Sequence, residues 1–261
     1  MRLLPLLLAI AACSKPAPPK TDFEAFERKW VAETDALASA MRERGETVDE
    51  KLVLTSYRGV YLGASGIWID RARIASLAEL SAKRVVIEEA IDRVAKILPT
   101  AGYSGLVVVL DLHGQSAAIA TEAFRLFAGK PAIFDLRRDD PAMPDRATER
   151  LFDGTLRAIP SANKPALSVF LDTKTIWVGV TQIDEFTQIA DLPDGRDFEK
   201  LDSVLRSMKA GEQFAERTDI ELAVSTGTAD DVLAALRAAM NAGFIDIAIL
   251  APDALSAKPS L

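Results

Sequence analysis

Few residues of this 261-residue chain have the chemistry of a catalytic or metal site. His113 is the only histidine and Cys13 is the only cysteine. A general base at His113 needs a carboxylate to orient it, and Asp111 stands two positions earlier, but no G-x-S-x-G nucleophile motif accompanies the pair. We therefore interpret His113 as a turn or surface residue. One histidine and one cysteine cannot form a zinc site and no EF-hand loop is present, so the sequence predicts no metal, no cofactor and no catalytic residue.

Other groups of residues resemble sites but have structural explanations. The run Gly63-Ala64-Ser65-Gly66 lacks the Lys-Ser/Thr of a phosphate-binding loop and falls in a predicted hairpin turn rather than before a helix. Acidic pairs occur at 139–140 and at 230–231. The second pair falls in the first turn of a predicted helix, where the helix dipole favours negative charge. A structural role is sufficient to explain the acidic pair at 230–231.

Cys13 has the surroundings of a lipid-modified cysteine. A basic start, Met1-Arg2, precedes a short apolar run over 3–10, which is too short for the roughly 20 residues that cross a bilayer. Ile10-Ala11-Ala12-Cys13 resembles the lipobox of bacterial lipoproteins, in which the cysteine sulfur is acylated (palmitate is one such group) and cleavage follows on its amino side. The prolines of 14–20 then favour an extended tether. The resemblance implies a protein anchored by Cys13 to the outer membrane, with the inner membrane as the alternative.

The composition of the chain is that of a globular protein without a nucleic-acid surface. Apolar residues make up 49% and charged residues 26%, which is enough for one large core or two small ones. The net charge of −7 argues against a partner with a phosphate backbone. Thr21 and Glu24 form a helix-start pattern, and apolar residues at helical spacing predict an amphipathic helix over 22–44.

The chain contains an internal repeat. Residues 60–74 align without a gap on 169–183, and five of the fifteen positions are identical, including Trp68 with Trp177. Each stretch predicts a β-hairpin. Trp68 and Trp177 are either matching ligand-stacking residues or, as we favour, core anchors of the two hairpins.

A similar order of elements follows each hairpin. Helical spacing predicts helices that end at Pro99 and at Gly211. A strand, a helix and a strand come next, with strands at 106–110, 132–136, 220–224 and 245–250 and helices at 116–128 and 228–242. Aligning Gly129 with Gly243 changes the offset from 109 to 114, which places five extra residues before the third strand of the second copy.

The predicted fold is α+β, with two repeated ββαβαβ domains that have mixed sheets and helices on one face. The predicted boundaries are a signal peptide at 1–12, a tether at 13–20, the N-terminal helix and its connection at 21–57, repeat 1 at 58–137, a connection at 138–165 with a short helix near 146–157, repeat 2 at 166–251 and a tail at 252–261.

The second copy resembles the periplasmic domain of the ExbD/TolR family. The resemblance lies in the hairpin 166–178 and in the closing stretch 220–248, whose helix ends in Ala242-Gly243-Phe244. It implies a dimerising envelope module associated with an ExbB/TolQ-like proton channel or with peptidoglycan. The family's transmembrane helix and its proton-path aspartate have no counterpart here. The resemblance therefore implies a binding module rather than a channel component.

The expected function is a non-catalytic binding or scaffold lipoprotein of the cell envelope, linked to biopolymer transport or energy transduction. A small-ligand-binding lipoprotein with a cleft between the repeats is one alternative. An envelope hydrolase that uses carboxylates or a serine not revealed by the sequence is the other.

Overall fold

The computed structural model describes residues 43, 59–63, 66–69, 72–97, 106–130, 132–138, 147–181, 185–193 and 195–259. The predicted signal peptide, Cys13, the tether and the acidic pair at 139–140 lie outside the described residues. So does the helix predicted over 22–44, apart from Glu43, which is helical.

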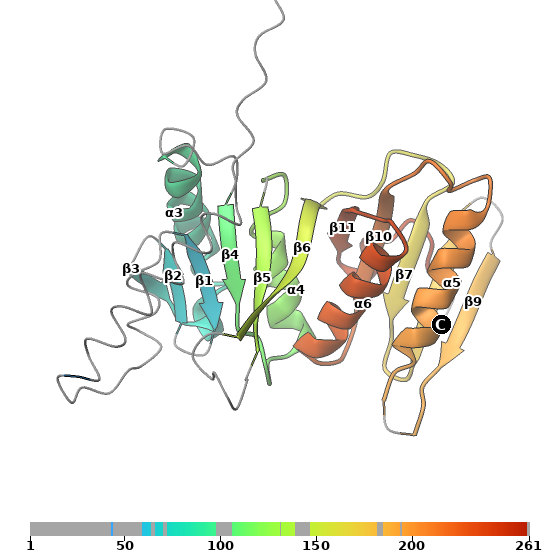
Figure 1. Cartoon of the computed structure of the whole chain (residues 1–261), viewed down its shortest axis with the longest axis horizontal. Helices are drawn as coiled ribbons and strands as arrows, with labels where there is room; N and C mark the ends of the chain where they lie inside the picture. Colours follow the sequence, from blue (N-terminus) through green and yellow to red (C-terminus); the bar gives the residue numbers. More distant parts are fainter. Residues whose placement is uncertain are drawn as a thin grey trace, which may run out of the picture.

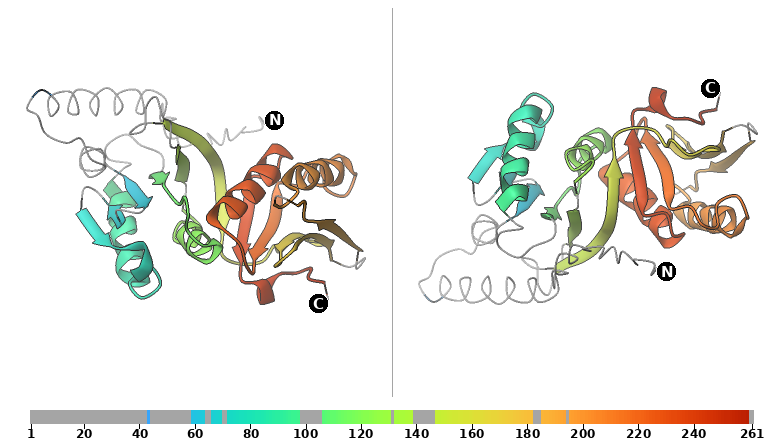
Figure 2. Two further views of the ribbon diagram at one scale, coloured as in Figure 1. Left: turned by 90° about the horizontal axis from the view of Figure 1, so that it is seen from below. Right: turned by 90° about the horizontal axis from the view of Figure 1, so that it is seen from above.

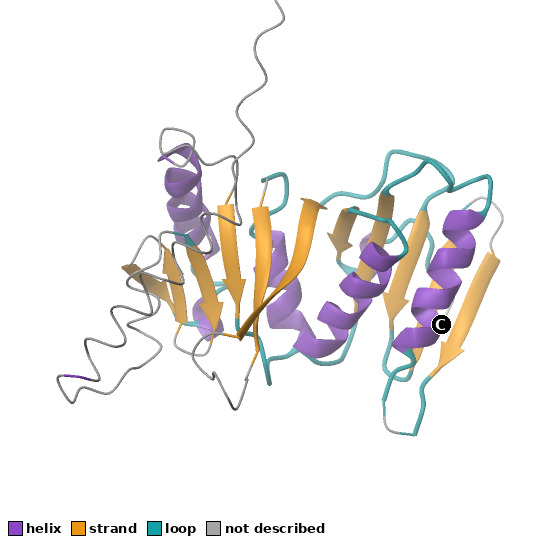
Figure 3. Cartoon of the chain, viewed as in Figure 1, coloured by secondary structure: helices purple, strands orange, loops and turns teal. Residues whose placement is uncertain are grey.

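The described chain is a mixed α/β structure with four α-helices (Figures 1 and 3). The N-terminal half contains β1 (Val60–Gly63), β2 (Gly66–Ile69), β3 (Ala72–Ala75), α3 (Arg84–Ile97), β4 (Leu106–Leu110), α4 (Ala117–Arg125) and β5 (Ala132–Arg138). Strand β6 (Ala147–Arg157) follows. The C-terminal half contains β7 (Leu167–Leu171), β8 (Thr175–Val180), β9 (Glu185–Ala190), α5 (Phe198–Ala210), β10 (Asp219–Val224), α6 (Ala229–Asn241) and β11 (Asp246–Leu250).

Each half builds a mixed sheet, and β6 joins the two. The strand order is β3-β2-β1-β4-β5-β6-β11-β10-β7-β8-β9. The hairpin strands pair antiparallel, whereas β1, β4 and β5 are mutually parallel, as are β7, β10 and β11. Strand β6 pairs antiparallel with β5 and parallel with β11. Figure 2 shows that β6 is long and bent, so that it reaches both halves.

One side of the strands packs on all four helices. In β7, Val169 and Leu171 point into this shared core, and α5 and α6 contribute apolar residues such as Leu205 and Leu236 to it. Phe170 points to the opposite side, because successive side chains of a strand alternate. We call this opposite side of the C-terminal half the back face. A small apolar cluster there also contains Leu255 from the segment after β11.

Most predicted elements lie where the sequence placed them. Helix α3 ends at Ile97, and α5 is followed by Gly211, its predicted stop. Helix α6 begins after Thr228, whose side chain forms a capping box with Asp231. Strand β4 has the predicted bounds. The expectation of an α+β architecture with mixed sheets is confirmed at this level.

Two local predictions need correction. The helix near 146–157 is wrong, because this stretch is strand β6. The open edges of β5 and β11 both offer main-chain hydrogen bonds, and pairing on two sides outweighs a weak local helix preference. Each hairpin also has a third strand, β3 or β9, which the predicted ββαβαβ pattern lacked. Both are edge strands, and such strands have little apolar signal.

Candidate functional site

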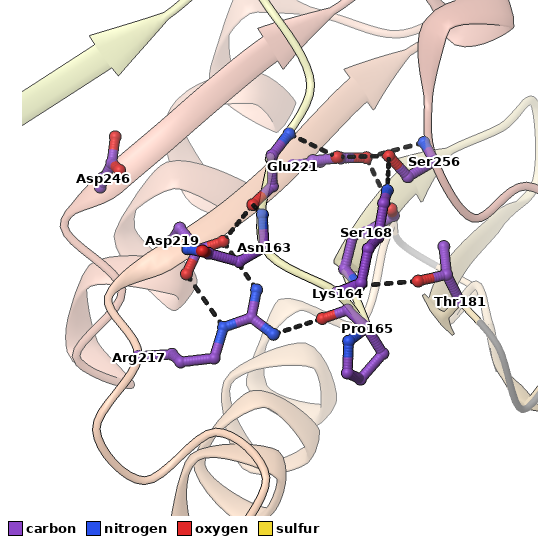
Figure 4. Close-up of polar contacts among 12 residues, drawn as sticks. Asn163, Lys164, Pro165, Ser168, Thr181, Arg217, Asp219, Glu221, Asp246 and Ser256 are labelled. Atoms are coloured by element: carbon purple, nitrogen blue, oxygen red, sulfur yellow. Dashed lines mark hydrogen bonds and ion pairs between the residues drawn. The ribbon is translucent and has the colours of Figure 1, made fainter.

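The candidate site is a group of polar side chains buried on the back face (Figure 4). We call it the buried polar cluster and define it by Ser161, Ser168, Asp219 and Glu221, which are at most 5% exposed. Strand β10 contributes the two carboxylates at alternate positions, so both side chains point to the same side of the sheet. The parallel pairing of β10 with β7 places Ser168 beside Glu221.

Glu221 accepts four hydrogen bonds although its residue is 0% exposed. The backbone N–H of Ser161 donates to Oε1 at 2.9 Å, and the hydroxyl of Ser168 donates to Oε2 at 2.9 Å. Ser256 donates twice, from its N–H to Oε2 and from its hydroxyl to Oε1, each at 2.7 Å. These donors replace the water that the carboxylate loses on burial. Glu221 therefore fastens two separate segments to β10.

Asp219 forms an ion pair at one end of the cluster. The Nε and Nη2 atoms of Arg217 lie 3.0 and 2.7 Å from its carboxylate oxygens, and the hydroxyl of Ser161 also donates to it. Arg217 donates a further hydrogen bond to the carbonyl of Pro165. Burial by itself raises the pKa of Asp219, but the hydrogen bonds from Arg217 and Ser161 outweigh burial and hold the pKa well below its ordinary value.

Ser256 contacts both a carboxylate and an ammonium group, as a serine nucleophile could. Its hydroxyl lies 2.7 Å from Glu221 and accepts a hydrogen bond from the Lys164 Nζ at 3.0 Å. Nucleophilic catalysis requires a base that takes the hydroxyl proton and free donors for the resulting oxyanion. Both oxygens of Glu221 are already occupied by four hydrogen-bond donors, and one of these donors is the N–H of Ser256 itself. In this geometry Ser256 attaches its segment to β10.

The residues singled out by the sequence do not meet at this cluster. His113 lies in a turn with 78% of its side chain exposed, and its Nδ1 is 3.6 Å from Asp230 rather than near Asp111. Asp111 instead accepts a hydrogen bond of 3.0 Å from the hydroxyl of Tyr61. The interpretation of His113 as a turn residue is confirmed, and Asp111 does not orient it.

Trp68 and Trp177 occupy matching places on β2 and β8. Trp68 is 9% exposed and lies opposite Tyr61 on β1, and Trp177 packs against the apolar cluster of the back face opposite Phe170 on β7. The indole N–H of each is buried, and neither has a hydrogen-bond partner within the described part of the chain. Trp68 is therefore buried and Trp177 half-buried on these strands.

The sequence analysis missed the buried polar cluster. Its carboxylates occur at alternate positions of a strand that is otherwise apolar, Asp219-Ile-Glu221-Leu-Ala-Val, and a charged residue at a core position is a usable signal. The partners of Glu221 could not be found this way. Ser161, Ser168 and Ser256 lie 60, 53 and 35 positions away along the chain.

The two halves touch directly at the beginnings of two helices. Ser116 and Thr228, the N-cap residues of α4 and α6, form an antiparallel backbone bridge. The N–H of Ala117 donates to Gly227 at 3.0 Å, and that of Ala229 donates to Gln115 at 2.9 Å.

Comparison with known proteins gives no relative. No family model, curated protein or solved structure matches this chain. Among the described residues, no helix has the length and apolar character needed to cross a membrane. The same residues contain no cluster of three or more metal-binding side chains.

Proposed function

We propose that this protein is a non-catalytic scaffold of the bacterial cell envelope, anchored through a lipid on Cys13 and built from two tandem ExbD/TolR-like domains. The observation that carries the proposal is the strand order on the two sides of β6. It reads β3-β2-β1-β4-β5 on one side and β9-β8-β7-β10-β11 on the other. Two copies of one βββαβαβ unit would produce this order.

The pairing registers support the duplication. Val60 pairs with Val108 in the N-terminal half, and Val169 pairs with Leu222 in the C-terminal half. The difference between 169 and 60 is 109, and the difference between 222 and 108 is 114. The offset between the halves therefore rises by five between the first and the second strand of the parallel set. The same change separates the two aligned blocks of sequence.

The contact between the halves supports a scaffold rather than a hinged ligand-binding protein. The N-caps of α4 and α6, which hold corresponding places, lie opposite each other in an antiparallel bridge, and the residues on either side of them form its backbone hydrogen bonds. Helices α4 and α6 also lie side by side in the middle of the molecule (Figures 1 and 2). Two subunits of a homodimer meet in this manner, residue against equivalent residue. A tandem pair would supply that arrangement within one chain.

Three measurements test the proposal in a Gram-negative bacterial host. Mass spectrometry of the mature protein should find an acylated Cys13 at the N-terminus, and Cys13→Ser should release the protein from membranes. Affinity purification with cross-linking should enrich an ExbB/TolQ-like channel protein, or sedimentation should recover the protein with peptidoglycan. An unmodified protein that begins at Met1, without a membrane or wall partner, would contradict the scaffold function.

The hydrolase alternative has its own test at Ser256. A fluorophosphonate probe phosphonylates activated serines with loss of fluoride. We expect it to leave Ser256 unmodified, because the Glu221 carboxylate beside the hydroxyl is already occupied by four hydrogen-bond donors. The matched control is the Ser256→Ala variant. Labelling of the wild type that is absent from this variant would favour the hydrolase.

A further inference from the structure

The segment after β11 crosses the back face without joining the sheet. Apart from the one-turn helix η3 (Pro252–Ala254), residues 251–259 form no regular element. Leu255 is 8% exposed and packs in the apolar cluster with Phe170 and Leu250. Ala257 is 6% exposed and approaches β8 at Gly179, where a Cβ atom would lie 3.2 Å from the Ala257 Cβ.

Side chains of β7 and β10 contact this segment through a small set of complementary groups. Glu221 accepts both the N–H and the hydroxyl of Ser256, so one carboxylate selects a residue that offers two donors on neighbouring atoms. The hydroxyl of Ser168 accepts the next N–H, that of Ala257, at 3.2 Å. The Lys258 ammonium lies 5.6 Å from the centre of the Phe170 ring. Four consecutive residues, Leu-Ser-Ala-Lys, are each contacted in a different way.

The segment 251–259 is held by side chains of the C-terminal half rather than by main-chain pairing with its sheet. The ladders of β7, β8, β10 and β11 are complete without residues 251–259. Releasing the segment would therefore break the hydrogen bonds to Glu221 and Ser168, the Lys164–Ser256 contact and the burial of Leu255, but no ladder bond. Segments of this kind can open at a free energy below that of global unfolding.

We propose that the surface under 255–258 is a docking site for an extended segment of a partner protein, and that the chain's own residues occupy it as an internal competitor. The partner segment would have an aliphatic residue, a Ser or Thr, a small residue and a basic residue in succession. The third residue should be small because Ala257 is 6% exposed and packs closely on β8 at Gly179. This proposal rests on the scaffold function, since it specifies the chemistry of the partner.

Peptide binding to the full-length chain tests the proposal without reference to the membrane. The probe is a fluorescein-labelled peptide with the sequence of residues 252–259, and the receptor is the Leu255→Ala/Ser256→Ala variant, whose own segment competes poorly. By fluorescence anisotropy we expect the variant to bind the peptide at least about tenfold more tightly than the wild type does. Adding Glu221→Gln should abolish binding, and a peptide with alanine in place of its serine should bind at least about tenfold more weakly. A folded variant that does not bind the peptide would overturn the proposal.

Hydrogen exchange of the wild-type protein gives a second test that needs no variant. The amides of Ser256 and Ala257 should exchange faster than those of β10, and faster still when excess unlabelled peptide competes for the surface. Exchange of the segment and of β10 at one common rate, with or without peptide, would mean that the segment opens only on global unfolding and would overturn the proposal. Failure of these tests would leave the lipid anchor and the envelope partners unaffected, because those are measured on Cys13 and in membranes.

Discussion

At the scale of single residues, Glu221 is the position on which the back face depends. Four donors surround this buried carboxylate, two on each oxygen, so both oxygens must accept hydrogen bonds for all four donors to be satisfied. It links the segment that contains Ser161 and the segment that contains Ser256 to β10. One substitution should therefore weaken contacts that are far apart in the sequence.

Glu221→Gln is expected to lower the free energy of unfolding by about 3 kcal/mol, because the amide NH2 group replaces an oxygen that accepts two hydrogen bonds and leaves both donors without an acceptor. Urea denaturation followed by circular dichroism measures the change. Glu216→Gln is the matched control, since Glu216 is exposed. Equal stability of the two variants would show that the four hydrogen bonds contribute little.

The second prediction at this scale concerns pH. Because the folded-state pKa of Asp219 is lowered, its contribution to stability is present above the unfolded-state pKa, near 3.8, and is lost as the pH falls from there through the folded-state value. The wild type should lose stability below about pH 4. Asp219→Asn should be less stable at pH 7 by about 3 kcal/mol, because Arg217 loses its buried partner.

Urea unfolding at a series of pH values checks this prediction. The difference between wild type and Asp219→Asn should shrink as the pH falls below 4. A difference that stays constant from pH 7 to pH 2 would exclude Asp219 as the titrating group.

At the scale of elements, the close approach of β8, β9 and the segment after β11 depends on a glycine. A Cβ at Gly179 would lie 2.7 Å from the ring of Phe186 on β9 and 3.2 Å from Ala257. Gly179→Ala is therefore expected to cost about 2 kcal/mol by overpacking. Thermal unfolding measures the loss.

A second substitution distinguishes overpacking from other effects. Adding Phe186→Leu to the Gly179→Ala variant should restore part of the lost stability, because the smaller side chain makes room for the alanine methyl group. If the stability lost in the double variant equals the sum of the losses in the two single variants, the clash with Phe186 is not the cause of the Gly179→Ala effect.

At the scale of the whole molecule, β6 is the connection between the two halves. It pairs with β5 on one side and β11 on the other, and Leu156 in this strand is 1% exposed in the shared core. Leu156→Ala should lower the free energy of unfolding by about 3 kcal/mol. Because the core is continuous, hydrogen exchange should increase in both β4 and β10.

Exchange that increases in only one half would show that the halves unfold independently.

The last prediction concerns the oligomeric state. A tandem pair that replaces a homodimer should remain a monomer in solution. The full-length Cys13→Ser protein suits sedimentation equilibrium, because it lacks the proposed lipid.

The elements with a strong local signal were predictable from residue types and spacing. The apolar stripes of α3, α5 and α6, the stop at Gly211 and the capping residues of α6 were all evident from residue types and spacing. These signals involve neighbours within a few positions. The alternation of strand with helix also indicated an α+β protein with mixed sheets.

The place of β6 and the set of residues that share the back face follow from contacts between distant parts of the chain. Strand β6 acquires its conformation from the edges of β5 and β11, which no local pattern reveals. Along the chain, Glu221 is a charged residue within an otherwise apolar stretch. Its donors come from three other segments, and hydrogen bonds between distant segments are set by how the strands pair rather than by spacing along the chain.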